Sequence, residues 1–185
     1  MRIIELFLIA VGVSMDAFSV AICKGLSTKE LSVKNAIIVG LYFGIFQSLM
    51  PIIGYFSGVS FSRFIEQWDH WIVFLILSIL GIQMVIEAIK TEECPVGDFS
   101  FKSMFPLAIA TSIDALAVGV TFAFLKVNIF TSALQIGLCT FIFSAMGVFL
   151  GSQFGQRLQK PAQTAGGVIL ILIGLKLLLK HTGVI

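Results

Sequence analysis

Hydrophobic and polar positions alternate in long blocks along this chain of 185 residues. Six blocks are apolar enough to cross a lipid bilayer as helices, since one crossing takes about 20 mostly apolar residues. They are Ile3–Cys23, Ala36–Gly58, Trp71–Ile89, Met104–Leu125, Ile129–Gln153 and Ala165–Leu179. The pattern therefore predicts an all-α, polytopic membrane protein with six transmembrane helices.

The polar segments between these blocks are short, and none is long enough to form a soluble domain. We expect one membrane domain in which residues 1–90 and residues 104–185 form two units joined by a loop at 91–103. Asn128 directly precedes the fifth block and is expected to cap its helix. The first block contains Asp16 and is not followed by a small-residue cleavage signal, so it reads as a retained span rather than a signal peptide.

Composition supports the membrane interpretation and excludes several functions. Hydrophobic residues make up 58% of the chain and charged residues 12%, whereas a soluble domain carries about 25% charged residues. The net charge of +2 and its scattered basic residues do not favour nucleic acid as a partner, and the lipid bilayer is the expected solvent. Cys23, Cys94 and Cys139 are far apart and form no C-x-x-C, so we expect them to be unpaired.

The two halves of the chain resemble each other. Ser14–Val20 reads SMDAFSV, and Ser112–Val118 reads SIDALAV, 98 positions later. At an offset of 97, three glycines of the second block meet glycines of the fifth block or its end: Gly40 and Gly137, Gly54 and Gly151, Gly58 and Gly155. Because three spans is an odd number, the second copy would enter the membrane from the opposite face. This predicts two inverted three-helix repeats, an arrangement common in transporters.

Asp16 and Asp114 fall near the middle of their spans, at equivalent positions of the two copies. A charged side chain at the bilayer centre costs about 2.5–3.5 kcal/mol on insertion scales. No lysine or arginine lies at matching depth in these two spans, so a divalent cation or a proton is the natural partner. The alternative is a neutral aspartate that joins helices by hydrogen bonds.

Five further residues carry oxygen atoms that suit hard cations such as Mn²⁺, Mg²⁺ or Ca²⁺. They are Ser14, Gln47, Glu87, Thr111 and Ser112. Ser14 and Ser112 lie two residues before an aspartate, so on a regular helix their side chains point away from the aspartate side chain. A break in the helix would change that direction and expose backbone carbonyls. Each of these residues could instead hydrogen-bond between helices, and Glu87 could reach the membrane interface.

Several segments together resemble the MntP manganese efflux pump family, of the LysE-type transporter superfamily. The resemblance covers nearly the whole chain. Val13–Phe18 (VSMDAF) resembles the opening of the family's sequences, and Ala110–Gly119 (ATSIDALAVG) is the closest match. It implies a bacterial inner-membrane exporter with Mn²⁺ as the transported substrate, no cofactor, and paired acidic motifs at Asp16 and Asp114. Gln47 falls where some family members carry Glu, which implies a different metal affinity or coupling here.

The expected mechanism is alternating access, in which Mn²⁺ reaches a midplane acidic site and the two repeats rock to open the other face. Three alternatives stay open. The protein could export another cation or small solute on a related fold, or it could be a purely structural membrane subunit. It could also be an intramembrane aspartyl protease with two acids sharing a proton, although no G-x-G-D motif is present. The sequence predicts no oligomeric state.

Overall fold

A computed structural model describes residues 3–26, 33–65, 69–89, 99–125, 127–154 and 159–181. In these residues the chain forms helices α1 (Ile3–Leu26), α2 (Val33–Ile65), α3 (Asp69–Ile89), α4 (Phe101–Ala110), α5 (Ile113–Phe124), α6 (Ile129–Phe154) and α7 (Gln159–His181). Since α4 and α5 together make one crossing, the described residues provide six spans that are long and apolar enough for a membrane. The predicted all-α, six-span fold is confirmed.

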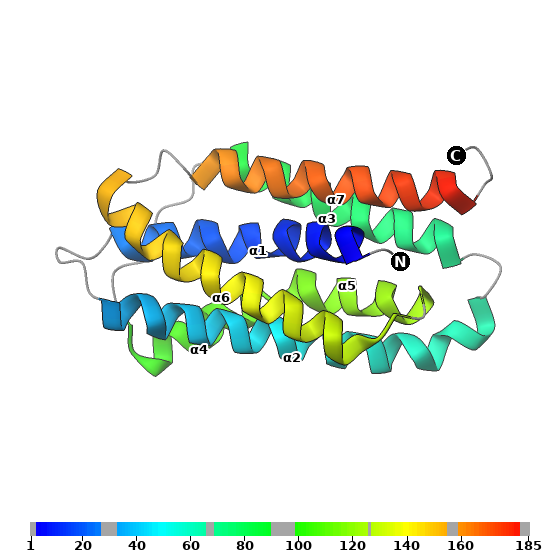
Figure 1. The fold of residues 1–185 in the computed structure, drawn as a ribbon, viewed down its shortest axis with the longest axis horizontal. Helices are drawn as coiled ribbons and strands as arrows, with labels where there is room; N and C mark the ends of the chain where they lie inside the picture. Colours follow the sequence, from blue (N-terminus) through cyan, green and yellow to red (C-terminus); the bar gives the residue numbers. More distant parts are fainter. Residues whose placement is uncertain are drawn as a thin grey trace.

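The helices form an elongated bundle, and their axes run roughly along its length (Figure 1). Helices α3 and α7 pack side by side, α1 packs against α6 and α7, and α2 packs against α5 and α6. Helix α6 crosses both α1 and α2 and so connects the two parts of the bundle. The first turn of α1 and the last turn of α7 lie at the same end, as an even number of spans requires.

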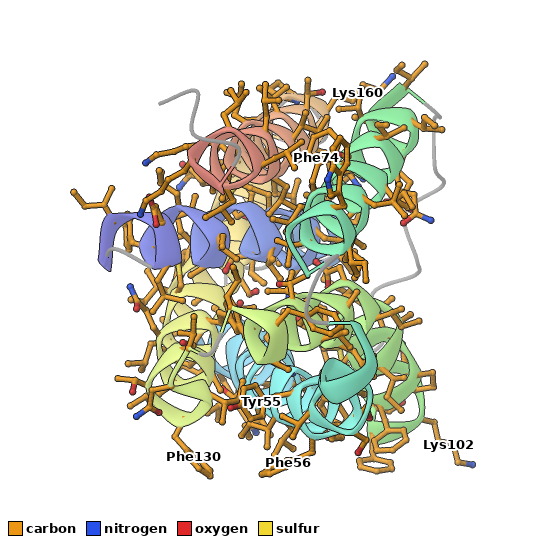
Figure 2. The ribbon with its side chains drawn as sticks, turned by 90° about the vertical axis from the view of Figure 1, so that its right-hand side faces the viewer. Tyr55, Phe56, Phe74, Lys102, Phe130 and Lys160 are labelled. Atoms are coloured by element: carbon orange, nitrogen blue, oxygen red, sulfur yellow. The ribbon has the colours of Figure 1, made fainter. Side chains whose placement is uncertain are left out.

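The outer surface of the bundle is apolar. Large hydrophobic side chains point outward from every span, and Figure 2 shows Phe56 and Phe130 projecting from the periphery. A continuous apolar exterior of this kind is stable in hydrocarbon and not in water. The interior contains a hydrophobic core that includes Ile9, Phe122 and Leu170, together with a set of fully buried polar side chains.

Three local features show how the sequence sets the helix ends. Asn128 caps α6, because its Oδ1 accepts a hydrogen bond of 3.4 Å from the Thr131 N–H, which confirms the predicted cap. Helix α2 is longer at both ends than the apolar block at 36–58. Helix α7 begins six residues before Ala165, and Pro161 falls in its first turn, where a missing N–H breaks no helical hydrogen bond.

The glycine contacts between α2 and α6 are reciprocal. A Cβ placed on Gly40 would lie 3.0 Å from the Phe141 carbonyl oxygen, and one on Gly137 would lie 2.8 Å from the Gly44 carbonyl oxygen. The offset of 97 residues turns one contact into the other, because it relates Gly40 to Gly137 and Gly44 to Phe141. Two structurally related halves would pack against each other in this way. The inverted repeat and its boundaries stay a prediction, and most of the loop at 91–103 lies outside the described residues.

The expectation that all cysteines are unpaired is wrong for Cys23. Cys23 is disulfide-bonded, whereas Cys139 carries a free thiol, and Cys94 lies outside the described residues. Separation along the sequence is a poor guide here, because folding brings distant segments together and a disulfide requires only that two cysteines lie close in space.

Candidate functional site

The fourth span is broken at Thr111 and Ser112, between α4 and α5. At the break the Ser112 N–H donates to the Ile109 carbonyl (3.1 Å), three residues back instead of four. The Ser112 hydroxyl donates to the Ala108 carbonyl (2.7 Å), and the Thr111 hydroxyl donates to the Leu107 carbonyl (3.0 Å). Such hydroxyls compete with backbone N–H groups, and they satisfy carbonyl oxygens that hydrocarbon would leave unpaired.

Asp114 occupies the first turn of α5, immediately after the break. The N–H groups of a first turn lack helical partners, and the helix dipole favours a negative charge there. One carboxylate oxygen, Oδ1, accepts a hydrogen bond of 2.6 Å from the Ala115 N–H. The other, Oδ2, is buried and has no hydrogen-bond partner. A buried acceptor left in this way is costly, so a cation can stabilise it strongly.

Two more carboxylates lie close to Asp114. Asp16 comes from α1 and Glu87 from α3, and each repels the Asp114 carboxylate electrostatically. The fold therefore brings the two predicted aspartates into one neighbourhood, although 98 residues separate them. Repulsion between neighbouring carboxylates favours the binding of a cation or a proton between them.

Gln47 joins the two aspartate-bearing helices. Its fully buried side chain extends from α2, and its Nε2 donates a hydrogen bond of 3.3 Å to the Val13 carbonyl of α1. The same side chain interacts with Asp114 of α5. Its Oε1 is buried and lacks a hydrogen-bond partner. Gln47 and Asp114 thus each present one unpaired oxygen in the interior.

The remaining predicted residue, Ser14, lies in an unbroken helix. Its hydroxyl donates to the Ala10 carbonyl (2.6 Å) and shares a hydrogen bond of 2.9 Å with the Thr140 hydroxyl of α6. Ser14 therefore makes the interhelical hydrogen bond that the sequence analysis gave as the alternative to a role as a cation ligand. The hydroxyls of Thr111 and Ser112 are likewise bonded to helix carbonyls. The structure thus brings Asp16, Asp114, Gln47 and Glu87 together, and it places the three hydroxyls in the helix framework.

These side chains do not form a ready-made metal cage. In the part of the chain that the structure describes, no three His, Cys, Asp or Glu side chains are grouped closely enough to hold a metal ion. A cation bound here would need amide, hydroxyl or backbone oxygens in addition to the carboxylates. Neutral oxygens of this kind are normal ligands of hard cations.

Sequence reasoning missed two polar features. Ser144 of α6 is fully buried, and its hydroxyl has no hydrogen-bond partner. The signal that could have found it is the offset of 97 residues, which relates Ser144 to Gln47. Glu5 is also buried, and its Oε1 lies 2.9 Å from Lys176 Nζ of α7. An isolated Glu at the start of an apolar block gives no sequence signal for this pairing.

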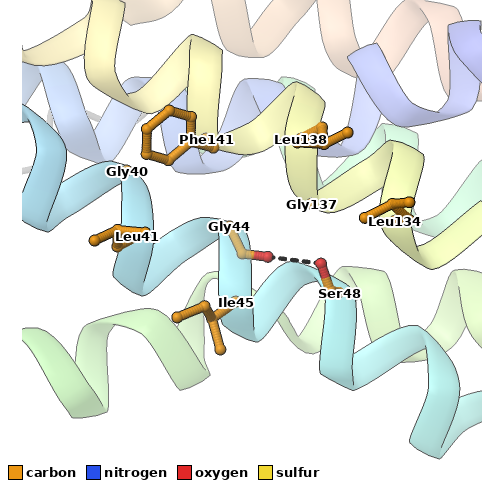
Figure 3. Close-up of a pocket in the computed structure, with 9 residues that line it drawn as sticks. All are labelled: Gly40, Leu41, Gly44, Ile45, Ser48, Leu134, Gly137, Leu138 and Phe141. Carbon is orange, nitrogen blue, oxygen red and sulfur yellow. Dashed lines mark hydrogen bonds between the residues drawn. The ribbon is translucent and has the colours of Figure 1, made fainter.

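A groove of about 180 Å³ lies elsewhere, on the surface between α2 and α6 (Figure 3). It is lined by Gly40, Leu41, Gly44, Ile45, Ser48, Leu134, Gly137, Leu138 and Phe141. Its one hydroxyl, that of Ser48, is bonded to the Gly44 carbonyl at 2.9 Å. A lining of glycines and apolar side chains offers no ligands to an ion, so this groove reflects close helix packing.

Six spans, a broken fourth span and neighbouring carboxylates on three of the helices are features typical of polytopic membrane proteins of the transporter class. Residues 30–178 match the model of the family described as "Putative manganese efflux pump" (MntP). The chain belongs to this family.

Relatives of the same printed name cover almost the entire chain. A protein from Acetivibrio thermocellus is 54% identical over 187 residues, covering 100% of this chain and 94% of the relative. One from Desulfitobacterium hafniense is 54% identical, covering 97% of this chain and 96% of the relative. One from Bifidobacterium adolescentis is 50% identical, with 98% of both chains covered. No solved structure matches this chain. The names describe pumps, which confirms the family resemblance of the sequence.

Proposed function

We propose that this chain exports Mn²⁺ from the cytoplasm across the bacterial inner membrane, through an acidic site that includes Asp16 and Asp114. The family supports the substrate and the direction, because its printed name specifies manganese and efflux. The site is supported by one observation above all. Two spans that are distant in sequence place carboxylates near each other in the interior, and one of their oxygens is buried without a partner.

Oxygen ligands would replace the water molecules of the transported ion. Asp16 and Asp114 would supply negative charge, and Glu87 would add to it from α3. The unpaired Oε1 of Gln47 would bind the ion without adding charge. Carboxylate and carbonyl oxygens suit Mn²⁺ better than they suit soft cations, which prefer sulfur ligands.

The hydroxyls of Thr111 and Ser112, at the helix break, would complete the shell, whereas the Ser14 hydroxyl, in an unbroken helix, points away from Asp16 toward Thr140. The Thr111 and Ser112 hydroxyls already donate their protons to helix carbonyls. A hydroxyl that donates still has oxygen lone pairs, so it can bind a cation without breaking that bond. The break between α4 and α5 also provides backbone groups near the site, as discontinuous helices do in other transporters.

Transport would proceed by alternating access, with the two halves rocking around this site. Carboxylates that release Mn²⁺ can take up protons, so an opposing proton gradient would drive the export. Transport into liposomes that responds neither to a pH gradient nor to a membrane potential would refute that coupling.

A cellular experiment tests the proposed function. A bacterial strain without its manganese exporter would express the wild-type chain, Asp16→Ala or Asp114→Ala, with membrane levels compared by immunoblot. We expect the wild-type chain to lower cellular manganese in Mn²⁺-rich medium and both variants to leave it high. Equal manganese contents with and without the wild-type chain would contradict the proposal.

A further inference from the structure

Spans one and four differ in shape, although the offset of 98 residues relates their sequences. The Ser14 hydroxyl donates to the Ala10 carbonyl (2.6 Å), and its equivalent, Ser112, donates to the Ala108 carbonyl (2.7 Å). Helix α1 is nevertheless continuous through this point, whereas the fourth span is broken there into α4 and α5. Two copies of one sequence pattern therefore adopt two different conformations in the same structure.

The neighbours of these two spans differ as well. An offset of 93 residues relates α3 to α7, because a Cβ on Gly81 would lie 2.5 Å from the Gly167 carbonyl oxygen, and one on Gly174 would lie 3.5 Å from the Phe74 carbonyl oxygen. Helix α7 packs closely on α1. Its counterpart α3 packs only sparsely on α5, and among the described residues it makes no substantial contact with α4. One of two equivalent interfaces is therefore closed, and the other is open at α4.

The open interface leaves apolar side chains uncovered. Met15 of α1 is 8% exposed, and a Cβ on Gly166 of α7 would lie 2.6 Å from the Met15 Cβ. Its equivalent, Ile113 at the start of α5, is 61% exposed. Ile173 of α7 is 4% exposed, whereas its equivalent, Leu80 of α3, is only partly buried. The uncovered residues of span four and of α3 are thus the equivalents of buried residues in α1 and α7.

Polar contacts hold the first half of each span in its present place. Near the start of α1, Glu5 is paired with Lys176 of α7 (2.9 Å). The two offsets relate these residues to Ser103 of α4 and Gln83 of α3. The Ser103 hydroxyl instead accepts a hydrogen bond of 3.1 Å from Lys24 Nζ of α1, and Gln83 is exposed. The start of α1 is therefore fastened to α7, whereas the start of α4 is fastened to α1.

We propose that α4 is a gate of the transport cycle, and that the cycle exchanges the conformations of spans one and four. This inference rests on the proposed function and on the predicted repeat, and it names the moving parts of alternating access. In the opposite state α4 docks on α3, Ser103 meets Gln83, and the fourth span straightens. The first half of α1 then separates from α7, with a break before Asp16, and the ion pair at its start opens.

The exchange is energetically feasible. Each state has one docked and one released half-span, so the apolar area uncovered at one gate is offset by the area covered at the other. The hydroxyl of Ser14 or Ser112 satisfies a carbonyl oxygen beside the break in either state, so the break leaves fewer unpaired groups in the membrane. Asp16 and Asp114 directly follow the two break points, so the acidic site lies between the two gates.

Disulfide crosslinking of the full-length chain in proteoliposomes tests the gate. The test pair is Gln83→Cys with Ser103→Cys, two positions that meet in the opposite state. The matched control pair is Ile82→Cys with Ser103→Cys, because Ile82 is also exposed but points to a different side of α3. The unchanged chain controls for the native cysteines, and Mn²⁺ flux before oxidation shows that each variant is folded.

We expect copper phenanthroline to join the test pair and to lower its Mn²⁺ flux to that of protein-free liposomes, and dithiothreitol to restore the flux. The control pair should crosslink far more slowly. Adding Glu5→Gln to the test pair should speed its crosslinking about fivefold, because it weakens the ion pair that holds the present state.

The outcomes separate this inference from the proposed function. If the wild-type chain transports Mn²⁺ but the test pair crosslinks no faster than the control pair, α4 does not dock on α3 and the inference is overturned alone. The same holds if the crosslinked chain transports at its original rate, or if Glu5→Gln leaves the crosslinking rate unchanged. If the wild-type chain transports no Mn²⁺, the proposed function fails, and the crosslinking, which needs no Mn²⁺, still decides whether α4 docks on α3.

Discussion

Lys176 Nζ on α7 lies 2.9 Å from Glu5 Oε1 on α1, so an ion pair joins the first span to the last. The two partners differ in exposure, because the Glu5 side chain is buried and the Lys176 side chain is about half exposed. An exposed lysine can extend its charge to the membrane interface, whereas a buried carboxylate cannot leave its site. The two residues should therefore respond differently to substitution.

We predict that Lys176→Met destabilises the protein more than Glu5→Gln does. Removing the lysine takes the cation away from a buried carboxylate, which should cost on the order of 2 kcal/mol, less than for a fully buried pair. The double variant should recover part of this loss. Thermal unfolding in detergent measures all three. Equal losses for the two single variants would contradict the predicted asymmetry, and a double variant that recovers none of the loss would show that the pair contributes little.

A second prediction concerns the contact of α2 with α5. A Cβ on Gly119 would overlap the Pro51 carbonyl oxygen, and one on Gly54 would overlap the Leu116 carbonyl oxygen. Backbone atoms cannot move aside without shifting a helix, so Gly119→Ala should destabilise the fold by about 1–3 kcal/mol. Gly174→Ala is the matched control, because its nearest neighbour would be the Leu77 Cβ at 3.1 Å. Similar unfolding temperatures for the two variants would mean that α2 and α5 pack less closely than these glycine contacts indicate.

Gln47 provides a third prediction. Gln47→Ala removes the donor to the Val13 carbonyl and the amide beside Asp114, so the KM for Mn²⁺ should rise. Gln47→Glu adds a carboxylate and should lower the KM at neutral pH. It should also steepen the loss of Mn²⁺ binding as the pH falls, because the metal then competes with more protons. Transport measured at two pH values checks this, and a wild-type KM in Gln47→Ala would exclude Gln47 from the site.

Much of the fold follows from the apolar blocks, because lipid admits only helices whose backbone groups are paired internally. The blocks at 71–89 and 129–153 match α3 and α6 to within two residues at each end. The block at 104–125 became two helices. Thr111 and Ser112 are adjacent hydroxyl residues that both bond to preceding carbonyls, while Ser14 alone leaves α1 regular. Apolarity by itself does not reveal that difference.

The site was only partly predictable. Asp16, Asp114 and Gln47 stand out in sequence because polar groups are costly in hydrocarbon. The buried Ser144 does not stand out in the sequence, because serine is common in membrane helices and its hydroxyl usually bonds to a carbonyl of its own helix. Its missing partner becomes visible only when the surrounding helices are in place. The pairing of Glu5 with Lys176 likewise depends on the packing of α1 against α7.

The most direct test of the central claim is Mn²⁺ flux into proteoliposomes by the wild-type chain, Asp16→Asn and Asp114→Asn. Asparagine keeps the size of aspartate and one of its two acceptor oxygens but removes its charge, and Ser132→Ala controls for reconstitution. If the two carboxylates carry the ion, both Asn variants should fall to the flux of protein-free liposomes while their unfolding temperatures stay near that of the wild type. Wild-type flux in Asp114→Asn at subsaturating Mn²⁺ would contradict the account.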